Sequence, residues 1–225
     1  MSGRKFLIKY CVSLVVFGLP LFGGAGTMRW WNAWAYIALI GLFSWLTWFM
    51  LRRYSPDLLA ERSRVHPDSK KWDRWLASII AGAGQLAILV VAGLDERLQW
   101  TGELPFWEEG AGFAIAFAAA AFMLWCMLVN RFFSTMVRIQ TERGHVVIDS
   151  GPYAFVRHPG YTGWAVFLIA TPLALGSLNA VWAAAACLVL LVIRTALEDA
   201  TLRRELTGYQ AYAARVRFRL IPFLW

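Results

Sequence analysis

Five uncharged, mainly apolar runs dominate the chain, at residues 10–28, 30–51, 75–94, 110–130 and 159–193. A bilayer core of roughly 30 Å needs about 20 residues in a helix that rises about 1.5 Å per residue, so each of the first four runs is long enough to cross once. The fifth is too long for one crossing and has Gly176, Ser177 and Asn179 near its middle, residue types that favour a turn. The pattern predicts a hairpin of two short helices there, over residues 159–175 and 180–193, and about six transmembrane helices in all.

The composition leaves little room for a water-soluble domain. Of the 225 residues, 59% are hydrophobic and 16% are charged, and the mean hydropathy is +0.52. These values are typical of an all-α integral membrane protein. We expect a single membrane domain, residues 1–225, in which residues 1–130 form four N-terminal helices and residues 131–225 carry the chemistry. All three cysteines lie in apolar runs, which excludes a disulfide scaffold.

Basic residues are concentrated on one side of the predicted bundle. The N-terminus, the segments 52–74 and 131–158, and the tail after residue 193 hold 20 of the 22 lysines and arginines. Six crossings place these four segments on the same side, and cytoplasmic segments collect Lys and Arg. We therefore expect a multi-pass protein with an uncleaved first helix and both termini in the cytoplasm. The net charge of +8 then reflects topology rather than nucleic-acid binding.

Polar side chains gather in two C-terminal segments that face this same side. In the first, Pro159 favours a helix start, because a proline in the first turn loses no hydrogen bond. His158 then lies at a helix entrance, with Tyr161 on the same face. In the second, Arg194 and Glu198 are four residues apart and share a helix face. They would form either an ordinary surface salt bridge or part of a cytoplasm-facing site.

Several familiar sites are absent from the sequence. It has no P-loop, no Gly-rich dinucleotide fingerprint, no G-x-S-x-G elbow and no H-E-x-x-H. The three histidines, His66, His145 and His158, are too dispersed for a metal cluster, so we expect no metal and place His66 in a solvated loop. No predicted span carries the charges expected of a proton path, which argues against a transporter.

Small and polar residues inside the spans predict helix packing. Gly82, Gly84 and Gly163 would allow neighbouring helices to approach closely. Gln85 is expected to make a hydrogen bond between helices.

The stretch GPYAFVRHPGYTGW, residues 151–164, resembles the signature of the isoprenylcysteine carboxyl methyltransferase family, which is related to membrane phospholipid N-methyltransferases. The similarity runs from about residue 130 to Pro222, and the first four helices match only as hydrophobic spans. The resemblance implies a membrane enzyme that transfers the methyl group of S-adenosyl-L-methionine to a lipid or lipidated acceptor, with a carboxylate as the expected acceptor group. This short six-helix form resembles bacterial members, whose acceptors need not be prenylated proteins. We therefore expect a bacterial inner-membrane protein, among membrane lipids, with no expectation for its oligomeric state.

The resemblance also implies roles for individual residues. Arg194 is expected to bind the acceptor carboxylate and, with Glu198, to form the catalytic pair. Asp199 replaces a second glutamate and receives no role. Gly160 stands where other members often carry serine. Cofactor contacts are expected from Gln140, from the backbone-lined stretch His145, Val146, Val147 and Ile148, from Tyr153, from the block His158, Pro159, Gly160 and Tyr161, and from Glu198.

Other activities stay open at this point. An amine acceptor must be presented as the neutral base, so a proton acceptor such as Glu198 or His158 would be needed. A sterol-reductase-like oxidoreductase that uses NADPH would share a related C-terminal architecture, and a non-catalytic membrane subunit would retain only the fold. The Arg-His-Pro-Gly-Tyr block favours methyl transfer.

Overall fold

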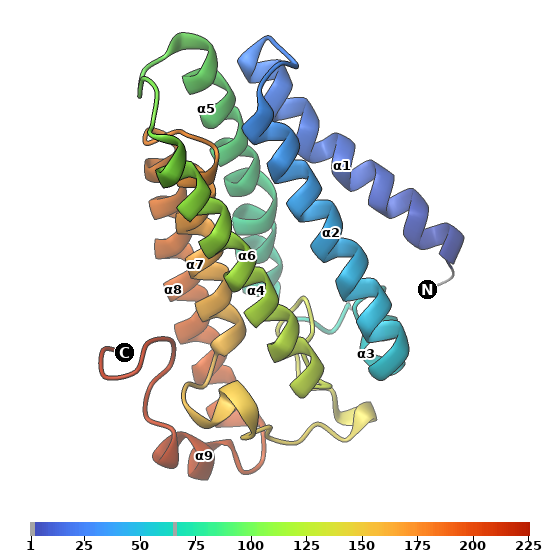
Figure 1. Ribbon diagram of the computed structural model, residues 1–225. Helices are drawn as coiled ribbons and strands as arrows, with labels where there is room; N and C mark the ends of the chain where they lie inside the picture. The colour runs from blue at the N-terminus through green and yellow to red at the C-terminus, as the bar shows by residue number, and fades with distance from the viewer. Residues whose placement is uncertain (1–2, 65–66) are drawn as a thin grey trace.

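The computed structural model describes residues 3–64 and 67–225 and folds them into helices and connecting loops (Figure 1). No strand occurs in these residues, which confirms the all-α prediction. His66, expected in a loop, lies outside them. The α-helices are α1 (Gly3–Ala25), α2 (Trp31–Tyr54), α3 (Pro56–Glu61), α4 (Lys71–Ser78), α5 (Gln85–Leu98), α6 (Phe106–Val129), α7 (Pro159–Ala174), α8 (Ala180–Glu205) and α9 (Tyr209–Arg215). A π-helical segment, η1 (Ile79–Gly84), joins α4 to α5, and two 3-10 turns are η2 (Thr141–Arg143) and η3 (Gly151–Ala154).

Five helical segments of the described chain are long and apolar enough to cross a membrane: α1, α2, the continuous α4–η1–α5 segment, α6 and α8. The predicted hairpin is present, because α7 begins at Pro159 and α8 at Ala180. Helix α7 has only 16 residues, below the length of the other five, and packs along α6 and α8. Helix α8 continues past residue 193 to Glu205, so it carries Arg194 and Glu198 on one unbroken helix.

Glycines set the spacing of some helices, as predicted for two of three positions. A Cβ at Gly84 would clash with the sulfur of Cys187 on α8, and one at Gly163 would lie 2.7 Å from Met123 on α6. The prediction for Gly82 is wrong, because a Cβ there would meet no atom within 4 Å. Gly82 belongs to the π-helical segment and faces a cavity.

Two polar contacts tie the helices together. The amide of Gln85 donates to the hydroxyl of Tyr36 on α2 at 3.2 Å, which confirms the predicted hydrogen bond between helices. At the far end of α5, the buried carboxylate of Asp95 accepts hydrogen bonds from Thr101, Ser177 and Asn179. Asp95 thereby fastens the α7–α8 turn to the bundle.

The two ends of the bundle differ in character. Exposed tryptophans lie where α2, α6 and α8 begin and in the loop before α6, a distribution typical of a membrane interface; they are Trp31, Trp34, Trp100, Trp107 and Trp182. At the other end, which is lower in Figure 1, loop 130–158 meets the last turns of α8, α9 and the C-terminal tail. Both polar segments predicted from the sequence therefore lie at the same end.

Candidate active site

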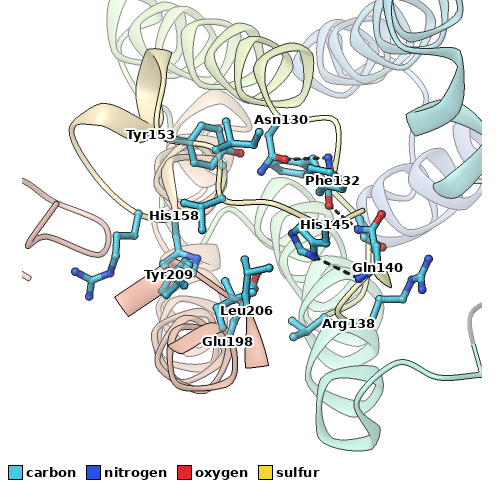
Figure 2. A pocket seen from close by; sticks show the side chains of 18 of the residues that line it. Asn130, Phe132, Arg138, Gln140, His145, Tyr153, His158, Glu198, Leu206 and Tyr209 are labelled. Atoms are coloured by element: carbon cyan, nitrogen blue, oxygen red, sulfur yellow. Dashed lines mark hydrogen bonds between the residues drawn. The ribbon is translucent and has the colours of Figure 1, made fainter. Parts of the chain in front are cut away.

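A polar pocket lies where loop 130–158, the start of α7, the end of α8 and α9 converge (Figure 2). It encloses about 820 Å³ of empty space, counting its open mouth. In Figure 2, Tyr153 and Asn130 lie on one side, Glu198 and Leu206 face them, and His145 and Gln140 close the space between. Segments far apart in the sequence thus form one concave wall.

Most of the residues predicted to contact a cofactor line this pocket. They are Gln140, His145, Val146, Val147, Ile148, Tyr153, His158, Gly160, Tyr161 and Glu198. Pro159 is not among the lining residues, because it is buried as the first residue of α7, where it begins the helix. Arg194 does not line the pocket either and faces a different hollow.

The stretch from Val146 to Ile148 offers unpaired backbone to the pocket. It forms no regular secondary structure, and no described residue makes a hydrogen bond to the N–H groups of Val146, Val147 or Ile148. Backbone N–H and C=O groups require partners when they are shielded from water. This stretch therefore supplies donors and acceptors that a bound ligand can use.

His145 is held as a neutral imidazole. Its Nδ1 accepts a hydrogen bond from the backbone N–H of Gln140 at 3.3 Å, which requires the tautomer with the proton on Nε2. Burial, with further contributions from the Arg143 and Arg138 guanidiniums, lowers the pKa of His145 from 6.5 to about 4. His145 consequently adds no charge to the pocket at neutral pH.

Titration of His145 checks this environment. In the folded protein we expect the ring to protonate with a midpoint near pH 4, whereas the unfolded chain does so near 6.5. Because the unfolded state then binds more protons, stability is lost as pH falls from about 6.5 towards 4. Histidine-selective NMR of the folded protein in micelles measures the midpoint, with His145→Asn to assign the signal. A midpoint near 6.5 would contradict the buried neutral form.

Tyr161 connects the pocket to α8. Its hydroxyl donates to the carboxylate of Glu198 at 2.5 Å, and its ring stacks on His158 with 5.9 Å between centroids. The predicted shared face of His158 and Tyr161 is therefore confirmed. The guanidinium of Arg194 lies over the Tyr161 ring, 5.2 Å from its centroid, so this ring already has a cationic neighbour and the Glu198 carboxylate is the group that suits a cationic ligand.

A single carboxylate organises the base of the pocket. Asp199 accepts hydrogen bonds from Arg157 at 2.7 Å, Arg203 at 3.0 Å, Arg219 at 3.1 Å and the hydroxyl of Tyr209 at 3.0 Å. The side chains of Asp199 and Arg157 are each only 1% exposed. Burial raises the pKa of Tyr209 well above its usual value, and the nearby Asp199 carboxylate raises it further. The Tyr209 hydroxyl therefore stays protonated and remains a hydrogen-bond donor.

The C-terminal tail is fastened to the pocket through its backbone. Arg157 donates to the carbonyls of Val216 and Arg217, both at 2.7 Å, and the N–H of His158 donates to the carbonyl of Arg219 at 2.9 Å. On α9, the Tyr212 hydroxyl donates to the carbonyl of Tyr153 at 2.7 Å. The tail thereby holds in place residues that line the pocket.

A second hollow, the membrane cavity, opens between α2, α6, α7 and the π-helical segment. It is larger, with about 2270 Å³ of empty space including its opening, and its lining is mainly apolar. Its charged lining residues are Arg62 and Arg194, and Tyr161 is among its polar ones. The membrane cavity and the polar pocket share one wall, whose residues line both hollows: Phe133, Ser134, Met136, Gly160 and Tyr161.

Gly160 has no side chain, and this leaves space for the ring of Phe133 in the shared wall. A Cβ at Gly160 would lie 2.4 Å from Cε2 of Phe133, so the ring occupies the space that a larger residue would fill. The guanidinium of Arg62 lies over the same ring at 5.5 Å. At this position, where the resemblance implies that other members often carry serine, the Phe133 ring takes the space that the missing side chain leaves.

Changing Gly160→Ser should therefore displace Phe133. We expect the free energy of unfolding to fall by about 1–3 kcal/mol, the usual cost of overpacking. The double variant Gly160→Ser with Phe133→Ala should lose less than the sum of the two single losses, because the clash is gone. Thermal unfolding of the four proteins measures this coupling. Strict additivity would show that the two residues do not compete for space.

Arg194 and Glu198 do not pair with each other. Arg194 instead donates to Asp73 on α4, with Nε to Oδ1 at 2.6 Å and Nη2 to Oδ2 at 3.2 Å. Glu198 accepts from Tyr161. The surface salt bridge considered from their spacing is therefore wrong, because Arg194 is buried and has a stronger partner from a distant helix.

Comparison with known protein families identifies this region. The model of the isoprenylcysteine carboxyl methyltransferase (ICMT) family matches residues 112–204, which run from α6 to the end of α8. This part of the chain is similar to that family. A search of curated proteins found no match. The ICMT family is a family of S-adenosylmethionine-dependent methyltransferases.

The polar pocket is chemically suited to the ICMT family's methyl donor, S-adenosylmethionine. Unpaired backbone at 146–148 offers hydrogen bonds to the polar parts of the nucleoside and amino acid. The carboxylate of Glu198, which lines the pocket, suits a positive sulfonium. When bound, this cofactor supplies an electrophilic methyl group.

Several contributors to the site are not predicted from the sequence, among them Asp199, Asp73 and Phe133. The sequence does contain one indication for Asp73 and Asp199. Charged residues inside or at the edge of a membrane span are rare unless they are paired, so each position indicates a paired carboxylate. Phe133 carried none, because its position depends on loop 130–158 folding back onto α7.

Proposed function

We propose that the polar pocket binds S-adenosylmethionine from the cytoplasm and that the membrane cavity holds the apolar tail of a lipid-borne carboxylate acceptor. The observation that supports this most directly is the shared wall of Phe133, Ser134, Met136, Gly160 and Tyr161, with a polar hollow on one side and an apolar hollow on the other. A charged cofactor can then reach the shared wall from the aqueous side, and a lipid can reach it from the membrane side. An isoprenylated cysteine, the acceptor type of the ICMT family, has the required combination of a carboxylate and a hydrocarbon tail.

The two expected catalytic residues take separate roles in this proposal. Glu198 lines the polar pocket and belongs to the cofactor side, with Tyr161 donating to it. Arg194 lines the membrane cavity and belongs to the acceptor side. The chain's contribution to rate is then mainly positioning and exclusion of water, because methyl transfer needs an in-line approach and no metal or dedicated base.

The same proposal includes the topology. We infer six crossings, with α7 as the sixth, since its 16 residues rise about 24 Å and it packs between longer spans. Both termini are assigned to the cytoplasm, on the side of the basic segments and of the polar pocket. Residues 131–225 act as the methyltransferase core, and the N-terminal helices contribute the walls of the membrane cavity.

A labelling experiment tests the function. Purified protein in lipid nanodiscs is incubated with methyl-labelled S-adenosylmethionine and N-acetyl-S-farnesylcysteine, and the product is treated with base. We expect the label to enter a base-labile methyl ester. Label in a base-stable amine of the nanodisc lipid, or no transfer from a protein that binds S-adenosylhomocysteine, would contradict the proposal.

A further inference from the structure

The guanidinium of Arg194 is bound along one edge only. Its Nε and Nη2 donate to the two oxygens of Asp73, and Nη2 also donates to the carbonyl of Thr135 at 3.0 Å. Nη1 makes no hydrogen bond to any residue that the structure describes, and Arg194 lines the membrane cavity. Nη1 is therefore the nitrogen available to a group in that cavity.

Asp73 is itself held rigidly and out of reach of any ligand. It is fully buried and lines neither hollow. Besides the two bonds from Arg194, its Oδ2 accepts the backbone N–H of Val137 at 2.6 Å. Donors from α8 and from the loop after α6 thus fix a carboxylate on the first turn of α4. Asp73 can act on the reaction only through Arg194.

We propose that Asp73 is a positioning residue of the methyl transfer: it directs Nη1 of Arg194 towards the acceptor carboxylate and offsets most of the arginine's positive charge. This inference rests on the acceptor-binding role proposed for Arg194. It adds a second function to the ion pair, namely control of how strongly the guanidinium attracts the acceptor.

The charge change in the reaction explains why this control matters. A lone pair of the carboxylate oxygen forms the new O–C bond, and the C–S electron pair stays on sulfur. The negative carboxylate and the positive sulfonium become a neutral ester and a neutral thioether. An unpaired arginine would stabilise the fully charged acceptor more than the partly neutralised transition state, which slows the step. In a cavity of low dielectric this penalty is larger than in water.

Asp73 lets Arg194 bind the acceptor without overstabilising its charged form. A guanidinium paired with a buried carboxylate has little net charge, yet Nη1 still donates a hydrogen bond in a defined direction. The acceptor carboxylate is then oriented without losing much of its nucleophilicity. The loop connects the ion pair to the shared wall, because Ser134 and Met136 line that wall while their neighbours Thr135 and Val137 contact Arg194 and Asp73.

The variant Asp73→Asn tests the inference, with N-acetyl-S-farnesylcysteine as acceptor. We expect kcat to fall about tenfold or more while the acceptor KM stays unchanged or decreases. The Kd of S-adenosylhomocysteine should stay within about twofold, which also shows that the variant is folded. Asp73→Glu, which keeps the charge, should recover part of kcat. An unchanged kcat, or a raised KM with normal kcat, would overturn the inference.

Asp95→Asn is the matched control. Asp95 is also buried, lies on the same continuous α4–η1–α5 segment and accepts several hydrogen bonds, but it is at the opposite end of the bundle. This control should lower thermal stability and leave kcat and the acceptor KM within about twofold of the parent values. If Asp95→Asn reproduced the kcat loss, a general effect of helix packing would replace the proposal.

A double variant separates this inference from the role of Arg194. In Arg194→Ala the carboxylate of Asp73 is left uncompensated and repels the acceptor, so adding Asp73→Asn should restore part of the lost kcat/KM. No recovery would contradict the charge-offset role of Asp73. Should Arg194→Ala alone leave acceptor use intact, the proposed function of Arg194 fails instead.

Discussion

Asp199→Asn should strongly destabilise the protein. It removes one partner of a buried ion pair and leaves the guanidinium of Arg157, 1% exposed, without its counter-charge. Breaking such a pair typically lowers the free energy of unfolding by about 3–5 kcal/mol. Arg203, Arg219 and Tyr209 lose an acceptor at the same time.

The loss should extend to cofactor binding. Tyr209 and His158 line the polar pocket, and the C-terminal tail is fastened through Arg157. We expect the affinity for S-adenosylhomocysteine to fall about tenfold or more, equivalent to about 1.4 kcal/mol. Thermal unfolding in micelles and titration calorimetry measure the two effects.

Asp149→Asn provides the comparison for Asp199. Asp149 pairs with Arg215 at the surface, where the two side chains are 49% and 69% exposed. Such pairs contribute under about 1 kcal/mol. If the two variants had equal effects, Asp199 would not be the organising carboxylate of the pocket.

Arg194→Ala should abolish most acceptor use without disturbing the cofactor. The pair that this variant removes is the one between Arg194 and the acceptor carboxylate. Truncating one partner of a buried, hydrogen-bonded charge pair across a binding interface costs about 2–5 kcal/mol of binding or more. We therefore expect the acceptor kcat/KM to fall about 100-fold, equivalent to about 2.7 kcal/mol. The Kd of S-adenosylhomocysteine should change little, since Arg194 does not line the polar pocket.

Arg204→Ala controls for loss of a positive charge on the same helix. Arg204 lies on the exposed end of α8. It should leave both acceptor kinetics and cofactor affinity within about twofold of the parent. Equal losses of acceptor use and cofactor binding in Arg194→Ala would contradict the separation of the two sides.

The pattern of apolar runs predicted the helices for two reasons. A run of about 20 residues is long enough to cross a bilayer, and a helix satisfies the backbone hydrogen bonds of such a segment internally. The pattern located the α7–α8 turn at Gly176 to Asn179 and the start of α7 at Pro159. The family signature likewise located ten of the residues that line the pocket, nine of them between residues 140 and 161, where a loop and one helix start bring them together.

Only the tertiary structure decided which charges pair. Arg194 and Glu198 share a helix face, yet Asp73, far away in the sequence, takes Arg194 because a buried guanidinium gains more from a carboxylate with two fixed oxygens than from a partly exposed neighbour. The shared wall is equally non-local, since Phe133 meets Gly160 only after loop 130–158 folds against α7. Periodicity and motif spacing report on one segment at a time, whereas the separation of a cofactor side from a lipid side arises from contacts between segments.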